Sequence, residues 1–228
     1  MKNSSFDFYI RTKDDLVNAV KTFGFVPLFA GSIPGFSVEE HVAPSVWFDS
    51  GSDGVWEWKG PVIRESGCAY GKFFENRAVF ISREWFCDFA NYRRNGYDFD
   101  SKCDEGLVFY RDKELYELID KNAPVLSKKL KALGNYRRDG KKGFDTSVNR
   151  LQAQCYVIIS DFKYEKDRYG STYGWGVAEY STPEMFMGDF FTSNVYSHTP
   201  EQSFDRILTH LKSLLPNAEE EKIRKILK

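Results

Sequence analysis

The sequence predicts an α+β protein, because segments with helical periodicity alternate with short apolar and aromatic runs that are typical of antiparallel strands. Aromatic runs broken by glycine and proline dominate the first half of the chain. The second half has three successive amphipathic segments followed by two β-rich runs, and two further amphipathic segments end the chain. We therefore expect an aromatic region of helix and antiparallel strands to be followed by a mainly helical region.

The composition is that of an ordinary globular protein, with 228 residues, 42% hydrophobic, 29% charged and a net charge of −1. No apolar run approaches the roughly 18 residues that a membrane span needs, and the amino-terminal residues lack the apolar core of a signal peptide. We expect a cytoplasmic protein without membrane contact. The four cysteines stand far apart and form no Cys-x-x-Cys pair, which predicts reduced, mostly buried thiols and no zinc site.

In the aromatic region, a helix is predicted over 13–23, with Thr12 as its N-cap and Gly24 at its end. A long irregular segment follows. Apolar runs at 55–65, 67–74 and 77–86 then predict an antiparallel meander. A helix that begins after Ser82 and ends at Gly96 comes next, and 97–106 reads as a polar loop. The carboxylates of this loop lack the spacing of a calcium site, so we predict no metal and no cofactor. They are Asp98, Asp100, Asp104 and Glu105.

Three helices are predicted over 112–122, 124–134 and 144–154, and two β-rich runs with a charged hairpin tip between them follow. This element order is that of a winged helix: three helices, a strand, a basic hairpin tip and a second strand. After it, a helix begins at Pro200, with Thr199 and Gln202 in the positions of a capping box. A short terminal helix is expected to pack against the rest of the protein.

A basic block lies inside this nearly neutral chain. Between Lys121 and Arg150 there are nine cationic residues and two acidic ones, Asp139 and Asp145. Such a block can attract a polyanion, although a solvated lysine-rich surface explains it equally simply.

The helix over 144–154 has one apolar face and one polar face. At 100° per residue, one face carries Phe144, Val148, Leu151 and Cys155, and the other carries Thr146, Asn149, Arg150 and Ala153. Arginine can read guanine and asparagine can read adenine in the major groove. The hairpin would contact the DNA backbone, with Tyr169 or Tyr173 as further donors. The DNA-binding residues predicted in this way are Lys141, Lys142, Thr146, Asn149, Arg150, Lys166 and Arg168.

Gln152 and Gln154 admit two roles. On a helix, two residues at this spacing point about 160° apart and cannot converge on one atom. On a strand they would lie on one face about 7 Å apart. We place the helix end near Gln154, because a β-branched run follows, and this favours packing or groove contacts over catalysis. Trp175, between two glycines, is expected to be core packing rather than a base-stacking platform.

Five stretches of the sequence carry a resemblance to a known family: "WEWKGPVIRE", "YGKFF", "REWFCDFANYRRNGYDFD", "GKKGFDTSVNRLQAQCYV" and "DRYGSTYGWGVAEYSTPE". They resemble a group of bacterial proteins related to the AlkZ-type winged-helix DNA glycosylases. These glycosylases are larger, and they excise alkylated or crosslinked bases without a cofactor, with a Gln-x-Gln motif that positions the attacking water. The resemblance implies a winged helix and a DNA-facing surface. It makes Gln152 and Gln154 catalytic candidates, since Gln152-Ala-Gln154 matches that motif.

These observations predict three regions, an aromatic α+β region over 1–108, a winged-helix region over 109–182 and a helical extension over 183–228. The predicted function is binding of double-stranded DNA, with DNA repair as the expected role, and the oligomeric state stays open. One alternative is a glycosylase, which needs a base pocket, an aromatic wall and a carboxylate or glutamine that orients water. Its candidate residues are Trp56, Trp58, Tyr92, Glu57, Asp88 and Asp98. The other alternative is a winged helix that binds proteins.

Overall fold

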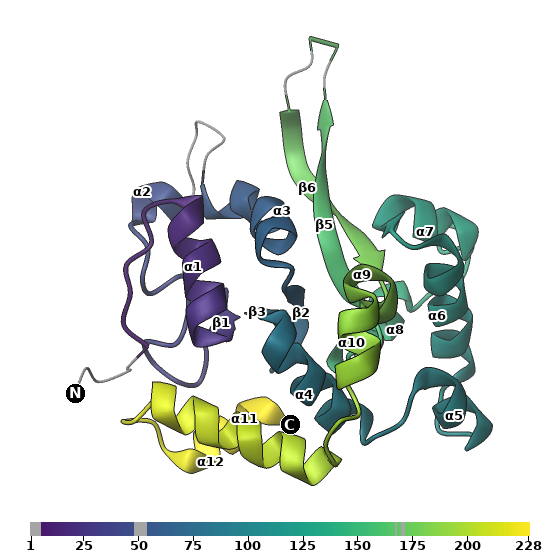
Figure 1. Ribbon diagram of the computed structural model, residues 1–228. Coiled ribbons are helices and arrows are strands. Elements are labelled where there is room, and N and C mark those ends of the chain that lie inside the picture. Colours follow the sequence, from purple (N-terminus) through teal and green to yellow (C-terminus); the bar gives the residue numbers. More distant parts are fainter. Residues whose placement is uncertain (1–5, 48–53, 167, 170–171) are drawn as a thin grey trace.

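A computed structural model describes residues 6–47, 54–166, 168–169 and 172–228 of the chain (Figure 1). Its strands form one antiparallel sheet in the order β1-β3-β2-β5-β6-β4, so the predicted α+β class is confirmed. The strands are β1 (Phe25–Pro27), β2 (Ala69–Phe74), β3 (Arg77–Ile81), β4 (Val125–Leu126), β5 (Ile158–Lys166) and β6 (Thr172–Ser181).

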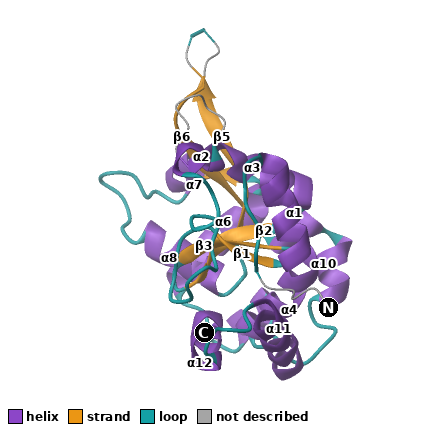
Figure 2. Cartoon of the chain, turned by 90° about the vertical axis from the view of Figure 1, so that its left-hand side faces the viewer, coloured by secondary structure: helices purple, strands orange, loops and turns teal. Residues whose placement is uncertain are grey.

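Helices surround this sheet, and the hairpin of β5 and β6 projects beyond them (Figure 2). Among the described residues, no helix is long and apolar enough to cross a membrane. The helices are α1 (Lys13–Phe23), α2 (Pro44–Trp47), α3 (Val55–Ser66), α4 (Arg83–Arg94), α5 (Phe99–Asp104), α6 (Tyr110–Asn122), α7 (Ser127–Leu133), α8 (Phe144–Ala153), α9 (Pro183–Met187), α10 (Asp189–Asn194), α11 (Pro200–Leu214) and α12 (Glu220–Leu227).

The sheet joins the two halves of the chain. β1, β3 and β2 come from the aromatic half, and β5, β6 and β4 come from the second half. The two groups meet where Tyr70 of β2 pairs with Ile159 of β5. At the far edge, Val125 of β4 pairs with Tyr180 of β6. The boundaries expected near 108 and 182 fall between elements, while the sheet itself runs across the first of them, and the division into three regions stays a prediction.

The prediction of a strand over 55–65 is wrong, because this segment forms α3. Gly60 and Pro61 had indicated a break, yet Val55, Trp58 and Val62 recur at helical spacing and are buried. Gly60 has a steric role in this helix. A Cβ on it would lie 2.6 Å from Asp161 Oδ1 and 3.4 Å from the backbone nitrogen of Phe162, so glycine lets α3 approach β5 closely.

The expected loop over 97–106 is also partly helical. Asp98 is the N-cap of α5, and its Oδ1 accepts a hydrogen bond from the Ser101 amide at 2.7 Å. Phe99 is buried, and its ring stacks on Tyr116 with 3.6 Å between centroids. The acidic composition of the segment favours a loop, but the Asp98 cap and the buried Phe99 ring stabilise a short helix.

The predicted capping residues are confirmed at two helices. Thr12 forms a capping box with Asp15 at α1, and Thr199 forms one with Gln202 at α11. Elsewhere the ends differ: α4 ends at Arg94 with Asn95 as its C-cap, just before the predicted Gly96, and α7 begins at Ser127 rather than at 124.

The carboxyl-terminal helices close one end of the molecule (Figure 1). α11 packs on α4, where the buried Asp88 accepts hydrogen bonds from Ser203 Oγ and Arg206 Nε, both at 2.9 Å. α12 buries Ile223 and Leu227, which confirms that it packs against the rest of the protein. The four cysteines are free, and three of them are buried.

Gly24 provides a test of close packing in this fold. Its φ is +76°, and a Cβ on it would lie 2.8 Å from Trp85 Nε1. We expect Gly24→Ala to lower the free energy of unfolding by about 3 kcal/mol, since a left-handed conformation and overpacking add up. Gly35 is the matched control, because its φ is +73° and a Cβ on it would meet no atom within 4 Å. Gly35→Ala should cost only about 1 kcal/mol in the same urea titration. Equal losses in the two variants would contradict this account.

Candidate nucleic-acid interface

The helix predicted to read DNA is the central element of the candidate site. The predicted apolar face of α8 is confirmed, since Phe144, Val148 and Leu151 are buried, as is Cys155 just beyond it. The helix ends at Ala153 with Gln154 as its C-cap, where the sequence placed it. α8 packs against α6 on one side and against β2 on the other.

The opposite face of α8 is only partly open. Thr146 is exposed, and Asn149 and Arg150 are half-buried. Arg150 donates to both carboxylate oxygens of the buried Asp112 on α6, with 2.8 Å between its NH2 nitrogen and Asp112 Oδ1. These hydrogen bonds raise the pKa of Arg150. Its guanidinium also lies 4.3 Å from the ring centroid of Phe109. Arg150 is therefore held on the protein surface, and its predicted contact with bases stays a prediction.

The basic turn, which we define as residues 137–142, precedes α8. Lys141 pairs with Glu114 of α6 at 2.9 Å, and Lys142 Nζ donates to the carbonyl oxygen of Arg138 at 3.1 Å. Both lysines are exposed, as are Arg137 and Arg138. The turn thus presents several cations beside the amino-terminal end of α8, where the helix dipole adds further positive potential.

The hairpin is the second predicted contact. Arg168 is exposed near its tip, with its guanidinium 4.6 Å from the ring centroid of Tyr169. The side chains of Lys166, Tyr173 and Trp175 lie outside the described part of the structure. At its base, the hairpin is fixed to α3: Tyr164 Oη donates to the Trp56 carbonyl oxygen at 2.9 Å. Arg64 of α3 and Lys163 of β5 both bind the carboxylate of Asp161.

Lys59 has an environment that no sequence pattern predicts. It is 8% exposed, and its Nζ lies 4.3 Å from the Trp56 ring centroid and 4.4 Å from that of Phe162. Within the described residues, its ammonium group has neither a hydrogen-bond nor an ion-pair partner. Burial lowers the pKa of Lys59 to about 8. The site between the Trp56 and Phe162 rings forms only when α3 packs against β5. Sequence patterns therefore do not predict it.

The two glutamines point toward different partners. Gln152 is 1% exposed, and its Oε1 accepts a hydrogen bond from the Lys72 backbone amide of β2 at 3.1 Å. Gln154 Oε1 accepts from Lys102 Nζ of α5 at 3.1 Å. The structure does not bring the two carboxamides together. In this arrangement, Gln152 contributes to the packing of α8 on the sheet.

The other glycosylase candidates are also dispersed. Trp58 is buried in the core. Tyr92 packs on Phe204 at 4.9 Å between centroids, beside a surface pocket of about 320 Å³. The candidate carboxylates have structural roles: Asp88 binds α11, Asp98 caps α5, and Glu57 accepts from the Gly54 amide. None of the other glycosylase candidates lines the pocket beside Tyr92.

A pair of substitutions tests the packing role of Gln152. Gln152→Ala should lower the free energy of unfolding by about 2 kcal/mol, because the Lys72 amide loses its acceptor in a buried contact. Gln154→Ala should cost less than about 1 kcal/mol, since the half-buried Lys102 can turn to water. Urea unfolding of both variants measures the difference, and a larger loss for Gln154→Ala would refute the assignment.

Lys59 predicts a pH-dependent stability. The pKa of Lys59 is about 8 in the folded state, below the ordinary value of 10.5. Between pH 8 and 10.5, Lys59 is therefore more often protonated in the unfolded chain than in the folded protein. Stability of the wild type therefore rises with pH from about 8 to 10.5. Lys59→Met should raise the free energy of unfolding by about 2 kcal/mol at pH 7, and this gain should shrink across that window. Lys21→Met, at an exposed position, is the control. A pH-independent effect of Lys59→Met would contradict the prediction.

Comparisons with known proteins place this chain in a family. A search of curated proteins and a search of solved structures gave no match. The family model described as AlkZ related matches residues 10–228, which includes every helix and strand described above. The chain therefore belongs to the AlkZ-related family.

Proposed function

We propose that residues 109–182 form a winged helix that binds double-stranded DNA, with α8 at the groove and the β5–β6 hairpin as the wing. The observation that carries this proposal is the element order α6, β4, α7, α8, β5, β6, together with the antiparallel pairing of β4 with β6. In a winged helix the third helix enters the major groove, and the hairpin follows the backbone.

Electrostatics supports the same surface. The basic turn has four exposed cations, Arg137, Arg138, Lys141 and Lys142, directly before α8. Arg168 is exposed toward the hairpin tip. Because the whole chain has a net charge of −1, this local excess of positive charge directs a polyanion to one place on the protein. Thr146 and Asn149 are then the side chains of α8 available to base edges, and Arg150 fixes the position of the helix.

Membership of the AlkZ-related family supports a role in DNA repair. The glycosylase hypothesis would need a water-positioning pair other than Gln152 and Gln154, since these side chains point to β2 and α5. We therefore propose DNA binding without assigning a catalytic residue. The alternative is a winged helix that binds a protein instead of DNA, and an absence of duplex binding in the next experiment would favour it.

Fluorescence anisotropy with a labelled duplex, measured across a salt series, tests the proposal. We expect micromolar affinity that falls steeply with salt. Lys141→Glu combined with Lys142→Glu should weaken binding by more than tenfold at low salt and lower the salt slope by about 2, one for each lost phosphate contact. Lys21→Glu combined with Lys225→Glu makes the same charge change on α1 and α12 and should have little effect.

Two outcomes would contradict the proposal. If the wild type binds no duplex even at low salt, the basic turn is a solvated or protein-binding surface. If both double variants weaken binding equally, only net charge matters, and α8 is not the contact.

A further inference from the structure

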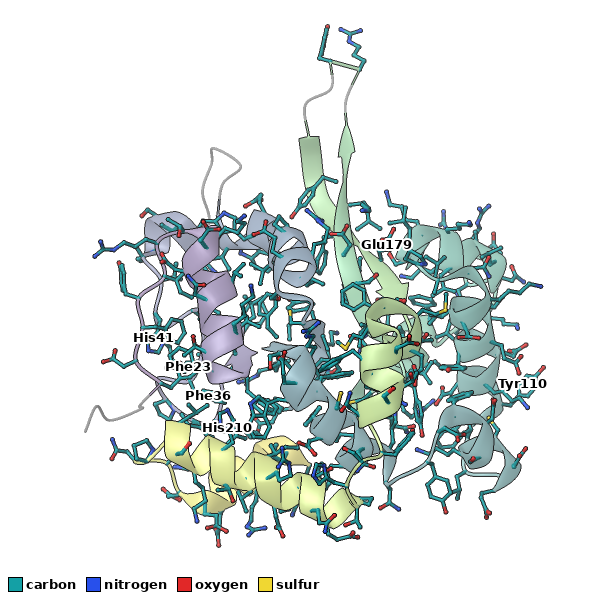
Figure 3. All side chains as sticks on the ribbon, viewed as in Figure 1. Phe23, Phe36, His41, Tyr110, Glu179 and His210 are labelled. Atoms are coloured by element: carbon teal, nitrogen blue, oxygen red, sulfur yellow. The ribbon has the colours of Figure 1, made fainter. Side chains whose placement is uncertain are left out.

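Three large apolar side chains in four successive positions face solvent just before and at the start of α6. Leu107, Phe109 and Tyr110 are 57%, 64% and 74% exposed. We call these three residues the aromatic wedge. Figure 3 shows Tyr110 directed away from α6 into solvent. Burial of such side chains is the usual outcome of folding, and a contiguous exposed group marks a binding surface.

The wedge is held in a defined conformation. Leu107 N donates to the Lys102 carbonyl at 3.1 Å, which closes the turn after α5. Phe109 is the N-cap residue of α6, and its carbonyl accepts from the Asp112 and Lys113 amides at 2.9 and 3.0 Å. Preorganised rings of this kind lose little conformational entropy when they bind.

The wedge adjoins the proposed DNA-binding surface. The guanidinium of Arg150 on α8 lies over the Phe109 ring at 4.3 Å. Tyr110 Oη donates to Glu114 Oε1 at 3.2 Å, and the same carboxylate oxygen accepts from Lys141 of the basic turn at 2.9 Å. The exposed Arg111 lies beside Gly143, which directly follows that turn, and a Cβ on Gly143 would lie 3.5 Å from the Arg111 Nη1. The aromatic rings and the phosphate-binding cations thus form one continuous surface.

The chemistry of this surface selects its partner. Cations beside exposed aromatic rings complement a ligand that has phosphates next to flat apolar faces, which is an unpaired nucleotide. In an intact duplex the base faces are hidden, and apolar side chains reach them only where the bases are unstacked. A neutral apolar protein partner would have to desolvate the Arg111 guanidinium and the ion pair between Lys141 and Glu114.

We propose that the aromatic wedge stacks on unpaired bases of DNA whose backbone is held by the basic turn, so that the protein prefers bulged or gapped duplexes to fully paired ones. This inference rests on the proposed DNA binding. Phe109 and Tyr110 provide the stacking faces, and Leu107 packs beside the displaced base.

The experiment compares the affinities of a fully paired duplex and the same duplex with a three-nucleotide bulge that contains 2-aminopurine. The wild type should bind the bulged duplex about tenfold more tightly, the order expected for stacking of one base, and should change the 2-aminopurine fluorescence. Phe109→Ala combined with Tyr110→Ala should abolish this preference and leave affinity for the paired duplex within about twofold.

Two further variants separate stacking from other effects. Phe109→Trp keeps an aromatic face next to Arg150 and should retain the preference for the bulged duplex. Loss of the preference in this variant would contradict the stacking role. Tyr9→Ala removes another exposed ring, 55% accessible and outside the 109–182 segment, and should change nothing. Circular-dichroism melting of each variant shows that it is folded.

The outcomes distinguish the two proposals. If the wild type binds paired and bulged duplexes equally, or the double alanine variant keeps the preference, the wedge inference is overturned and DNA binding stands. If the wild type binds neither duplex, both proposals fail. If sedimentation shows a dimer that the double alanine variant abolishes without an effect on DNA, the wedge is an interface between copies of the chain, and the inference is also overturned.

Discussion

The buried charge of Arg94 is the constraint on which the arrangement of this protein depends. Its side chain is 1% exposed, so its guanidinium must find partners inside the fold. It donates to Glu184 of α9 at 2.7 Å and to the Cys155 carbonyl, just after α8, at 2.8 Å. Its guanidinium also lies 4.6 Å from the Tyr156 ring centroid. Because Arg94 lies on α4 and these partners come from α9 and from the residues just after α8, Arg94 fixes the end of the helix of the proposed DNA interface relative to α4 and α9.

This anchoring decides which part of α8 is accessible. Gln152 holds its carboxyl-terminal end against β2, Arg94 ties the residue just after it to α4, and Arg150 is bound to α6 through Asp112. What remains open is the amino-terminal half, with Thr146 and the basic turn. A recognition helix that is held at one end reads fewer bases than a fully exposed one. In the proposed binding mode, the aromatic wedge, which lies against Arg150, would offset that loss with contacts that do not depend on the major groove.

The sequence was informative where local interactions decide the structure. Thr12 and Thr199 cap their helices through residues three positions away, and the apolar period of α8 follows from its own residues. Sequence patterns do not predict contacts between residues that are far apart in the chain. The partner of Gln152 is 80 positions away and that of Arg150 is 38 positions away, so neither pairing leaves a local trace. The α3 segment was misread because Gly60 suits a close contact with β5 as well as a break between strands.

Two features conflict with the rules that make a fold stable, and both adjoin the proposed winged helix. Lys59 is buried next to Phe162 of β5, and in the described structure it forms no ion pair. The aromatic wedge exposes apolar rings to water, next to Arg150 of α8. Such local conflicts are expected where a surface is adapted to a ligand. In the binding mode proposed above, unpaired bases would cover the exposed rings of the wedge, which would remove the second conflict.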